Sequence, residues 1–164
     1  MRTPNCALLG QAASPSDSLR SFVQGFYDWY APKAVSTTVG FACDLAIAYL
    51  SSDFSPQLVQ ELREDSAAQA NVEGVIAGLD FDPFLGSQDP GERYEVGTIA
   101  QKGSSQWADI HGVWAAQRSS STDVVAELVL QDGHWTFVNF HYPDGSDLLT
   151  VLKLLREGRQ KSTH

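Results

Sequence analysis

The stretch Thr122–Tyr142 reads TDVVAELVLQDGHWTFVNFHY and contains two runs with a side-chain period of two, one on each side of Asp132-Gly133. This period is typical of β-strands, and Asp-Gly is a strong signal for a tight hairpin turn. The stretch therefore predicts two antiparallel strands, over 122–131 and 134–142.

Two earlier segments have the same period. Residues 94–102 and 106–118 predict two more strands, and short turns rich in glycine and serine separate the segments. Because such short connections join antiparallel neighbours, we expect a four-stranded meander.

The N-terminal half has a helical period instead. Apolar side chains recur at i, i+3, i+4 and i+7 over 18–31, which predicts a helix with Ser16 or Asp17 as its cap. Pro32 is expected to end this helix. A second, shorter helix is expected over 41–50.

Two further helices are predicted. One begins at Ser55, before a proline, and its apolar positions continue to Leu79, with a polar stretch at 66–71 that can interrupt it. The other spans 146–157, with Gly158 as its C-terminal cap.

Helices followed by an antiparallel meander indicate an α+β fold. We expect N-terminal helices packed on a curved four-stranded antiparallel sheet, cone-like and with a pocket inside, and a C-terminal helix. The length of 164 residues suits one domain, over 18–157. Residues 1–17 are expected to be a flexible N-terminus or signal remnant, and 158–164 a tail.

Composition narrows the function classes. Hydrophobic residues make up 43% and charged residues 19%, which argues against disorder, and the net charge of −9 disfavours nucleic acid as a partner. The charge is uneven, because residues 151–164 carry a net +3 and the first 150 a net −12. No apolar run approaches about 20 residues, so we expect no membrane span.

The two cysteines do not indicate a metal site. Neither Cys6 nor Cys43 belongs to a CxxC pair. A disulfide between them stays open, although the apolar surroundings of Cys43 favour a buried free thiol. Residues 6–13 resemble the tail of a secretory signal, which suggests a periplasmic or secreted protein and leaves a cytoplasmic one possible.

Several motifs together resemble a known family. FYDWY at 26–30, LDFDPFLGSQD at 79–89, GHW at 133–135 and Tyr142 resemble the bacterial family catalogued as domain of unknown function 3828. That family is similar in architecture to the nuclear transport factor 2-like (cystatin-like) superfamily, and the resemblance covers about 18–157. It implies an envelope or secreted protein but no activity, since the superfamily includes enzymes, ligand-binding modules and immunity proteins.

The second predicted strand carries a candidate site. Asp109 and His111 are two residues apart, so their side chains share one face of the sheet. With Glu127 or Asn139 on neighbouring strands they can form an acid–base or ligand-binding site. The opposite face of this strand is more apolar, however, and this favours a solvated or partner-binding role for the polar face.

The loop before the sheet offers clustered oxygen atoms from Asp80, Asp82, Gln88 and Asp89. Such a cluster can hold calcium, but the spacing does not match a known calcium loop. The favoured interpretation is that the aspartates bind loop backbone while Phe84 and its apolar neighbours close the end of the cone. A partner-binding loop is the other alternative.

Two tyrosines of the first helix, Tyr27 and Tyr30, can place their hydroxyls into a ligand pocket, although core packing is the commoner role of such side chains. His134 and His141 are expected at the surface or in turns. We predict no metal site and no cofactor.

These observations favour a non-catalytic binding module of the bacterial envelope or secreted space, whose partner is a small ligand or a basic protein. An immunity-type protein that neutralises a toxin and a ketosteroid isomerase-like enzyme stay open as alternatives. The superfamily resemblance also implies a possible homodimer through the sheet, with Trp107 or Trp135 in the contact.

Overall fold

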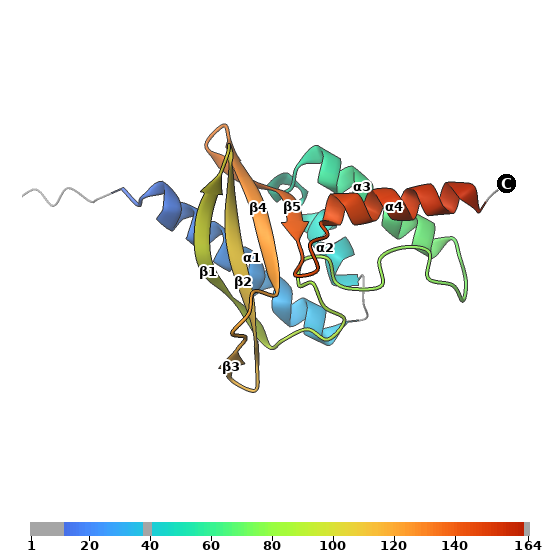
Figure 1. Ribbon diagram of the computed structural model, residues 1–164, viewed down its shortest axis with the longest axis horizontal. Helices are drawn as coiled ribbons and strands as arrows, with labels where there is room; N and C mark the ends of the chain where they lie inside the picture. The colour runs from blue at the N-terminus through green and yellow to red at the C-terminus, as the bar shows by residue number, and fades with distance from the viewer. Residues whose placement is uncertain (1–11, 38–40, 163–164) are drawn as a thin grey trace, which may run out of the picture.

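The computed structural model describes residues 12–37 and 41–162. Helices come first, a sheet follows, and a helix ends the chain (Figure 1). In chain order the elements are α1 (Pro15–Ser36), α2 (Phe41–Tyr49), the 3-10 turn η1 (Ser51–Asp53), α3 (Pro56–Ala70), β1 (Arg93–Lys102), β2 (Ser105–Trp114), β3 (Gln117–Arg118), β4 (Val124–Gln131), β5 (His134–His141) and α4 (Leu148–Lys161).

The sheet is antiparallel and open, with strand order β1-β2-β4-β5 and the short β3 paired to the end of β2. The α+β fold class is therefore confirmed. The single strand predicted over 106–118 is wrong beyond Trp114. Ala115 and Ala116 have positive φ angles of 48° and 61°, so the chain turns there and β3 runs back along β2.

The hairpin between β4 and β5 is confirmed. Asp132 and Gly133 have φ angles of 50° and 77°, as a two-residue turn of this kind requires, and Gln131 pairs with His134. Further along, the register shifts, because Glu127 pairs with Asn139 while the next residue of β4 pairs with Phe137. One residue of β5, Val138, is left over in a bulge.

The first helix is longer than the sequence indicates. It begins after Ser14, whose Oγ accepts a hydrogen bond from the Asp17 amide, so the predicted cap was wrong. It also continues through Pro32, which lies exposed inside the helix. Proline removes one backbone hydrogen bond, but Ala34 beyond it is buried and extends the apolar stripe.

The third and last helices follow the prediction only in part. Ser55 caps α3 as expected, accepting from the Leu58 amide, but α3 ends at Ala70 and the later apolar residues lie outside any helix. The last helix, α4, is capped by Asp147 and passes Gly158, the expected cap, without ending. The first helix thus begins at Pro15 and the last ends at Lys161, whereas the sequence placed these two ends at 18 and 157.

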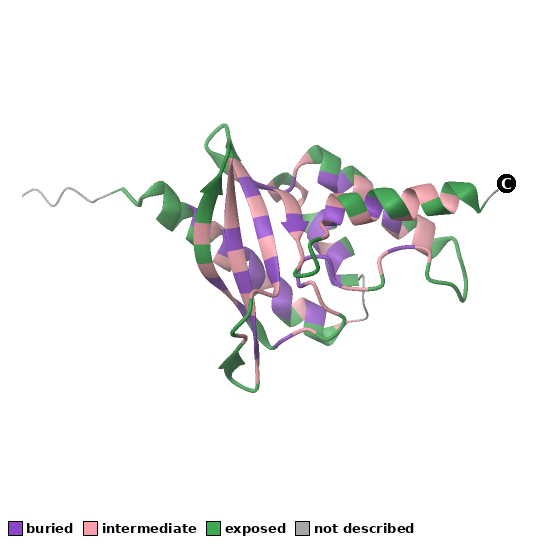
Figure 2. Cartoon of the chain, viewed as in Figure 1, coloured by how far each residue is buried: buried purple, intermediate pink, exposed green. Residues whose placement is uncertain are grey.

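Burial alternates along the strands, so the sheet has two distinct faces (Figure 2). Helix α1 lies across one of them, here called the inner face, and α2, α3 and α4 gather beside β5 (Figure 1). Aromatic rings fill the inner side, with centroids 5.0–5.6 Å apart between neighbours. These rings belong to Phe26, Tyr27, Tyr30, Phe54, Phe84, Phe137 and Phe140.

On the opposite side, the outer face, no helix of the part of the chain that the structure describes lies over β1, β2 or β4 (Figure 1). Among residues 12–37 and 41–162, no helix combines the length and the apolar character needed to cross a bilayer.

Candidate functional site

The outer face carries the polar side chains that the sequence singled out on β2. Ala108 and Ile110 are fully buried on the inner face, whereas Asp109 and His111 are half-buried and lie on the outer face. Asp109 and His111 are therefore separated by the sheet from the aromatic interior.

Five residues form a contiguous group near the β1–β2 hairpin, which we call the outer-face cluster: Lys102, Ser105, Trp107, Glu127 and His141. Glu127 accepts a hydrogen bond of 2.7 Å from the Ser105 hydroxyl and contacts His141 Nε2 at 2.7 Å through its other oxygen. The Trp107 ring stacks on the His141 ring at 4.0 Å, and Lys102 Nζ lies 3.7 Å from the Trp107 ring centre.

The order of groups in this cluster limits its chemistry. The carboxylate of Glu127 lies between Ser105 and His141, so the serine hydroxyl points at a carboxylate and not at an imidazole base. A serine nucleophile needs its base within hydrogen-bond reach, and here that place is taken by Glu127. The Trp107 indole N–H is buried and has no hydrogen-bond partner among the described residues.

Asn139 supports the start of α4. Its Nδ2 donates to Asp147 at 2.9 Å, and its Oδ1 accepts from the amides of Phe140 and Leu149. Burial alone would raise the pKa of Asp147, but the hydrogen bonds from Asn139 and Thr150 leave that pKa below its usual value. Both polar atoms of the Asn139 side chain are thus engaged, and the bonds with Asp147 and Leu149 hold β5 to α4.

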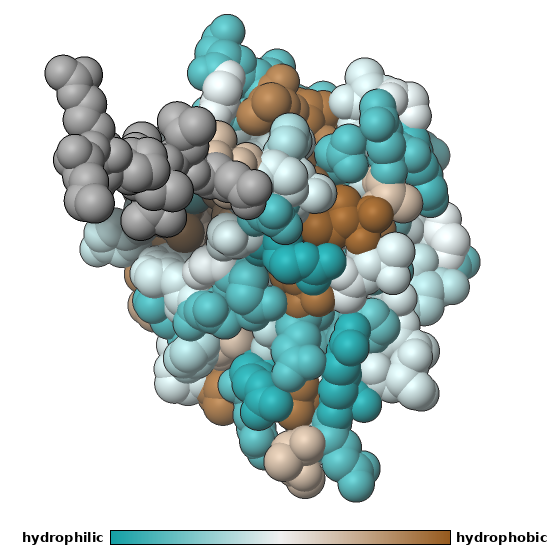
Figure 3. All heavy atoms as spheres, turned by 90° about the vertical axis from the view of Figure 1, so that its left-hand side faces the viewer, coloured by the Kyte–Doolittle hydropathy of each residue, from teal (hydrophilic) through white to brown (hydrophobic). Residues whose placement is uncertain are grey.

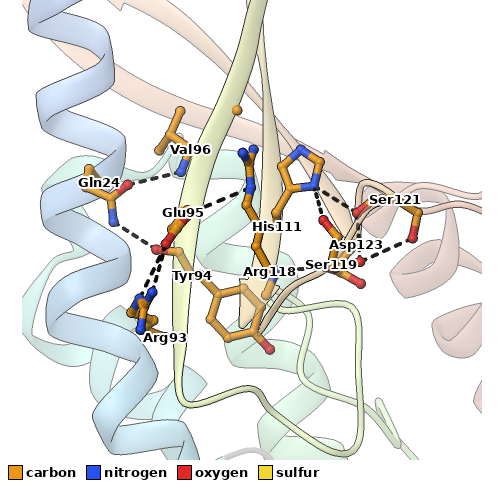
Figure 4. Close-up of polar contacts among 12 residues, drawn as sticks. Gln24, Arg93, Tyr94, Glu95, Val96, His111, Arg118, Ser119, Ser121 and Asp123 are labelled. Atoms are coloured by element: carbon orange, nitrogen blue, oxygen red, sulfur yellow. Dashed lines mark hydrogen bonds and ion pairs between the residues drawn. The ribbon is translucent and has the colours of Figure 1, made fainter. Parts of the chain in front are cut away.

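His111 is fixed by the turn before β4. Its Nδ1 lies 2.8 Å from the Ser121 carbonyl oxygen and 3.2 Å from that of Ser119 (Figure 4). Because carbonyl oxygens only accept, Nδ1 carries the proton. A Cβ atom placed on Gly97 would lie 2.7 Å from His111 Nε2, so the glycine allows the imidazole to lie against β1.

Charged neighbours of His111 are paired, but Asp109 is not. Glu95, opposite His111 on β1, contacts Arg93 at 3.1 Å and Arg118 at 3.6 Å (Figure 4). Within the described part of the chain, the half-buried Asp109 carboxylate has neither a hydrogen bond nor an ion pair. It is thus available to a group outside the chain.

The two tyrosines and Asp82 lie in the packed interior. Tyr27 and Tyr30 are 1% and 0% exposed, and their hydroxyls donate to the Phe84 carbonyl and to Asp82 Oδ2. Asp82 also accepts from the amides of Phe84 and Leu85. Burial raises the pKa of Asp82 to about 6, although these hydrogen bonds oppose the shift. The network joins the loop to α1 and leaves no polar group of these tyrosines for a ligand.

The other loop residues are exposed at the surface. Gln88 Nε2 donates to the Asp80 carbonyl at 2.8 Å, and the Asp89 amide donates to Ser87 Oγ at 3.0 Å. Asp82 is buried and bonded to Tyr30, whereas Asp80 and Asp89 are exposed. In the ranges that the structure describes, no three histidine, cysteine or carboxylate side chains form a group suited to a metal ion.

A cavity of about 300 Å³ lies between α2, α3 and the loop, away from both faces of the sheet. Cys43, a buried free thiol, contributes to its wall, and burial raises the pKa of that thiol. The other lining residues are Phe41, Asp44, Leu62, Asp65, Ser66, Gln69, Ala70, Leu79, Phe81 and Pro83. Cys6 lies outside the described residues.

The sequence did not indicate the outer-face cluster as a unit. Regular pairing from the Asp132-Gly133 turn would place Glu127 opposite Val138, and His141 on the inner face. The bulge at Val138 reverses the facing of the residues after it, so Asn139 and His141 lie on the outer face instead. No residue pattern in β5 marks that bulge.

Asp109, His111, Glu127 and Asn139 thus share one face without converging in a closed cavity. Searches for similar proteins gave no match among protein-family models, curated proteins or solved structures. The family resemblance and the homodimer through the sheet stay predictions.

Proposed function

We propose that this protein is a non-catalytic module that binds a partner protein through the outer face of its sheet. The observation that carries the proposal is the Asp109 carboxylate, half-buried on that face with no partner among the described residues. A buried or half-buried carboxylate gains from an ion pair, so the partner is expected to offer a lysine or arginine.

Two further features support a protein over a small ligand. The space between α1 and the inner face of the sheet, where a cone-like fold would enclose a small ligand, is packed with aromatic rings. The outer face offers Trp107 beside Asp109, and aromatic side chains are enriched at protein interfaces. The net charge of −9 also favours a basic partner by electrostatic steering. Neutralisation of a basic toxin would be one form of this function.

The test uses a library of random 12-residue peptides displayed on phage and selected on the full-length protein. We expect the selected peptides to be enriched in lysine and arginine. Their affinity is expected to fall by about tenfold for Asp109→Asn, because that substitution keeps the shape and removes the charge.

Glu73→Gln is the matched control, since it removes one negative charge from an exposed position on the α3–β1 connection. It should leave the affinity nearly unchanged. Peptides without basic residues, or peptides that bind Asp109→Asn as tightly as the wild type, would contradict the proposal.

A further inference from the structure

The outward edge of β1 is divided into two halves. In the first half, side chains of α1 bind the backbone of β1 in place of a neighbouring strand. Gln24 donates to the Tyr94 carbonyl at 2.8 Å and accepts from the Val96 amide at 3.0 Å (Figure 4). Arg20 donates to the carbonyls of Val96 and Gly97 at 2.8 and 2.9 Å.

The second half of β1 begins after a bulge, where Val96 pairs with Ile110 but Ile99 pairs with Ala108. On β2 the Ile110 carbonyl accepts from the Asp123 amide, on the side away from β1. In a regular strand alternate residues point their backbone groups the same way, so Ala108 also points away from β1.

By the same alternation the backbone groups of Gln106, which pairs with Gln101, also point away from β1. When the backbone groups of a β2 residue point away from β1, that residue and its β1 partner form no hydrogen bonds with each other. The backbone N–H and C=O of the β1 partner then point away from β2, toward the open edge of the sheet. Ile99 and Gln101 therefore direct their backbone groups to the open edge.

These outward groups are available for pairing. Across the described residues, the backbone groups of Ile99 and Gln101 at this edge have no hydrogen-bond partner. Residues 98 and 100–102 are exposed and Ile99 is half-buried. Figure 3 views this side of the molecule, where hydrophobic patches are separate and lie among hydrophilic side chains. An occupant would thus be held mainly by backbone hydrogen bonds.

The opposite edge of the sheet differs, because β5 is covered. The Ser55 amide donates to the Phe137 carbonyl at 2.8 Å, Phe54 forms a parallel bridge with Phe137, and His141 forms a bridge with Asp147. Exposed strand edges are sites where another chain can add a strand. The second half of β1 has no such cover at Ile99 and Gln101 among the described residues.

We infer that residues 98–102 of β1 bind an extended segment of another protein, which adds a strand to the sheet and carries a carboxylate at each end. Cationic residues lie at both ends of the open half. At the bulge the Arg20 guanidinium donates to the carbonyls of Val96 and Gly97, and at the hairpin Lys102 ends β1, with its Nζ over the Trp107 ring on the outer face. They limit the added strand to about five residues and favour acidic residues at its two ends.

A second copy of this chain fits the edge less well. Antiparallel pairing of two β1 edges about Ala100 would bring Lys102 of one copy next to Arg20 of the other. This contact places like charges together, which an acidic residue at the same position would not do. The inference differs from the outer-face proposal, because it concerns backbone groups at the edge and not the Asp109 carboxylate, although Lys102 borders both sites.

The probe is a capped seven-residue peptide with five alternating valines and threonines between two aspartates. NMR on the full chain should show hydrogen exchange of the Ile99 and Gln101 amides slowed by about tenfold or more when the peptide is bound. A twin peptide with lysines in place of the aspartates should bind about tenfold more weakly, because its ends would face Arg20 and Lys102.

Gln101→Pro removes the outward N–H and places the proline ring where the added strand would lie, and proline is tolerated at such edge positions. It should abolish peptide binding, whereas Gln101→Ala loses the same side-chain contact with Gly103 and should bind like the wild type. Circular dichroism should confirm that both variants fold. Asp109→Asn should bind this peptide normally, which separates this test from that of the outer face.

Three results would overturn the inference. The first is unchanged peptide binding by Gln101→Pro. The second is strong protection of the Ile99 and Gln101 amides in the free full-length chain, which would mean that another part of the chain occupies the edge. The third is a dimer, detected by sedimentation, that Gln101→Pro dissociates, which would identify a second copy as the occupant.

Discussion

Tyr30 and Asp82 lie 52 residues apart in the chain, and the tyrosine hydroxyl donates a 2.7 Å hydrogen bond to the buried Asp82 carboxylate. The contact fastens the loop before the sheet to α1. Because Asp82 also binds the amides of Phe84 and Leu85, one carboxylate fixes both the loop's own turn and its attachment to the helix.

This arrangement predicts how stability depends on pH. The pKa of Asp82 is raised from 3.8 to about 6, so Asp82 binds its proton more tightly in the folded protein than in the unfolded chain. The contribution of Asp82 is complete below about pH 4 and is lost as the pH rises through 6. Relative to Asp82→Asn, the wild type should lose on the order of 2 kcal/mol of unfolding free energy between pH 4 and pH 7.

Urea denaturation of both proteins at several pH values measures this difference. Asp80→Asn, a substitution at an exposed neighbour, should leave the pH dependence of the wild type intact. Parallel pH profiles for the wild type and Asp82→Asn would show that the raised pKa does not affect folding.

A second prediction concerns the helix side chain that binds the edge of β1. Gln24→Ala removes the partners of the Tyr94 carbonyl and the Val96 amide, and should cost about 1 kcal/mol of unfolding free energy. Hydrogen exchange at the Val96 amide should also become faster. Gln60→Ala is the control, since Gln60 bonds only with exposed Glu64 on its own helix and should change stability by less than about 0.5 kcal/mol. Equal effects of the two substitutions would argue against a role for Gln24 at the edge.

The glycines provide a third prediction, with opposite signs at two positions. A Cβ atom on Gly112 would overlap the indole ring of Trp114, which packs against Tyr94, so Gly112→Ala should destabilise the protein by about 1–3 kcal/mol.

Gly158 lies inside α4, and a Cβ atom added there would have nothing within 4 Å, so Gly158→Ala should stabilise the protein by about 0.5–1 kcal/mol. Thermal unfolding of the two variants measures both effects. A stabilising Gly112→Ala would mean that the indole moves aside freely.

Local patterns in the sequence were sufficient to predict the structure of segments whose conformation depends mainly on their own residues. The Asp132-Gly133 turn, the apolar stripe of α1 and the Ser55 cap all appear as predicted, because each depends on residues a few positions apart. Helix α1 continues past Pro32 to Ser36, with Ala34 buried, although the local signal of the proline predicts an end there.

The candidate site was predictable only in part, for a related reason. The facing of Asp109 and His111 follows from the period of β2, and both lie on the outer face. Glu127 and His141 meet only because of the bulge at Val138, which depends on how β5 fits between β4 and α4. Register shifts of this kind are set by tertiary packing, so they cannot be predicted from single residues of the strand.

The capping of β1 by α1 also has a consequence for synthesis of the protein. Helix α1 leaves the ribosome about 70 residues before β1, so the side chains of Arg20 and Gln24 exist before the strand whose backbone they bind. When β1 is synthesised, the side chains that bind the first half of its edge are therefore already present in the same chain. This reduces the chance that β1 pairs with another nascent chain. A fragment that begins after Gln24 would lack this protection, and we expect it to aggregate through β1.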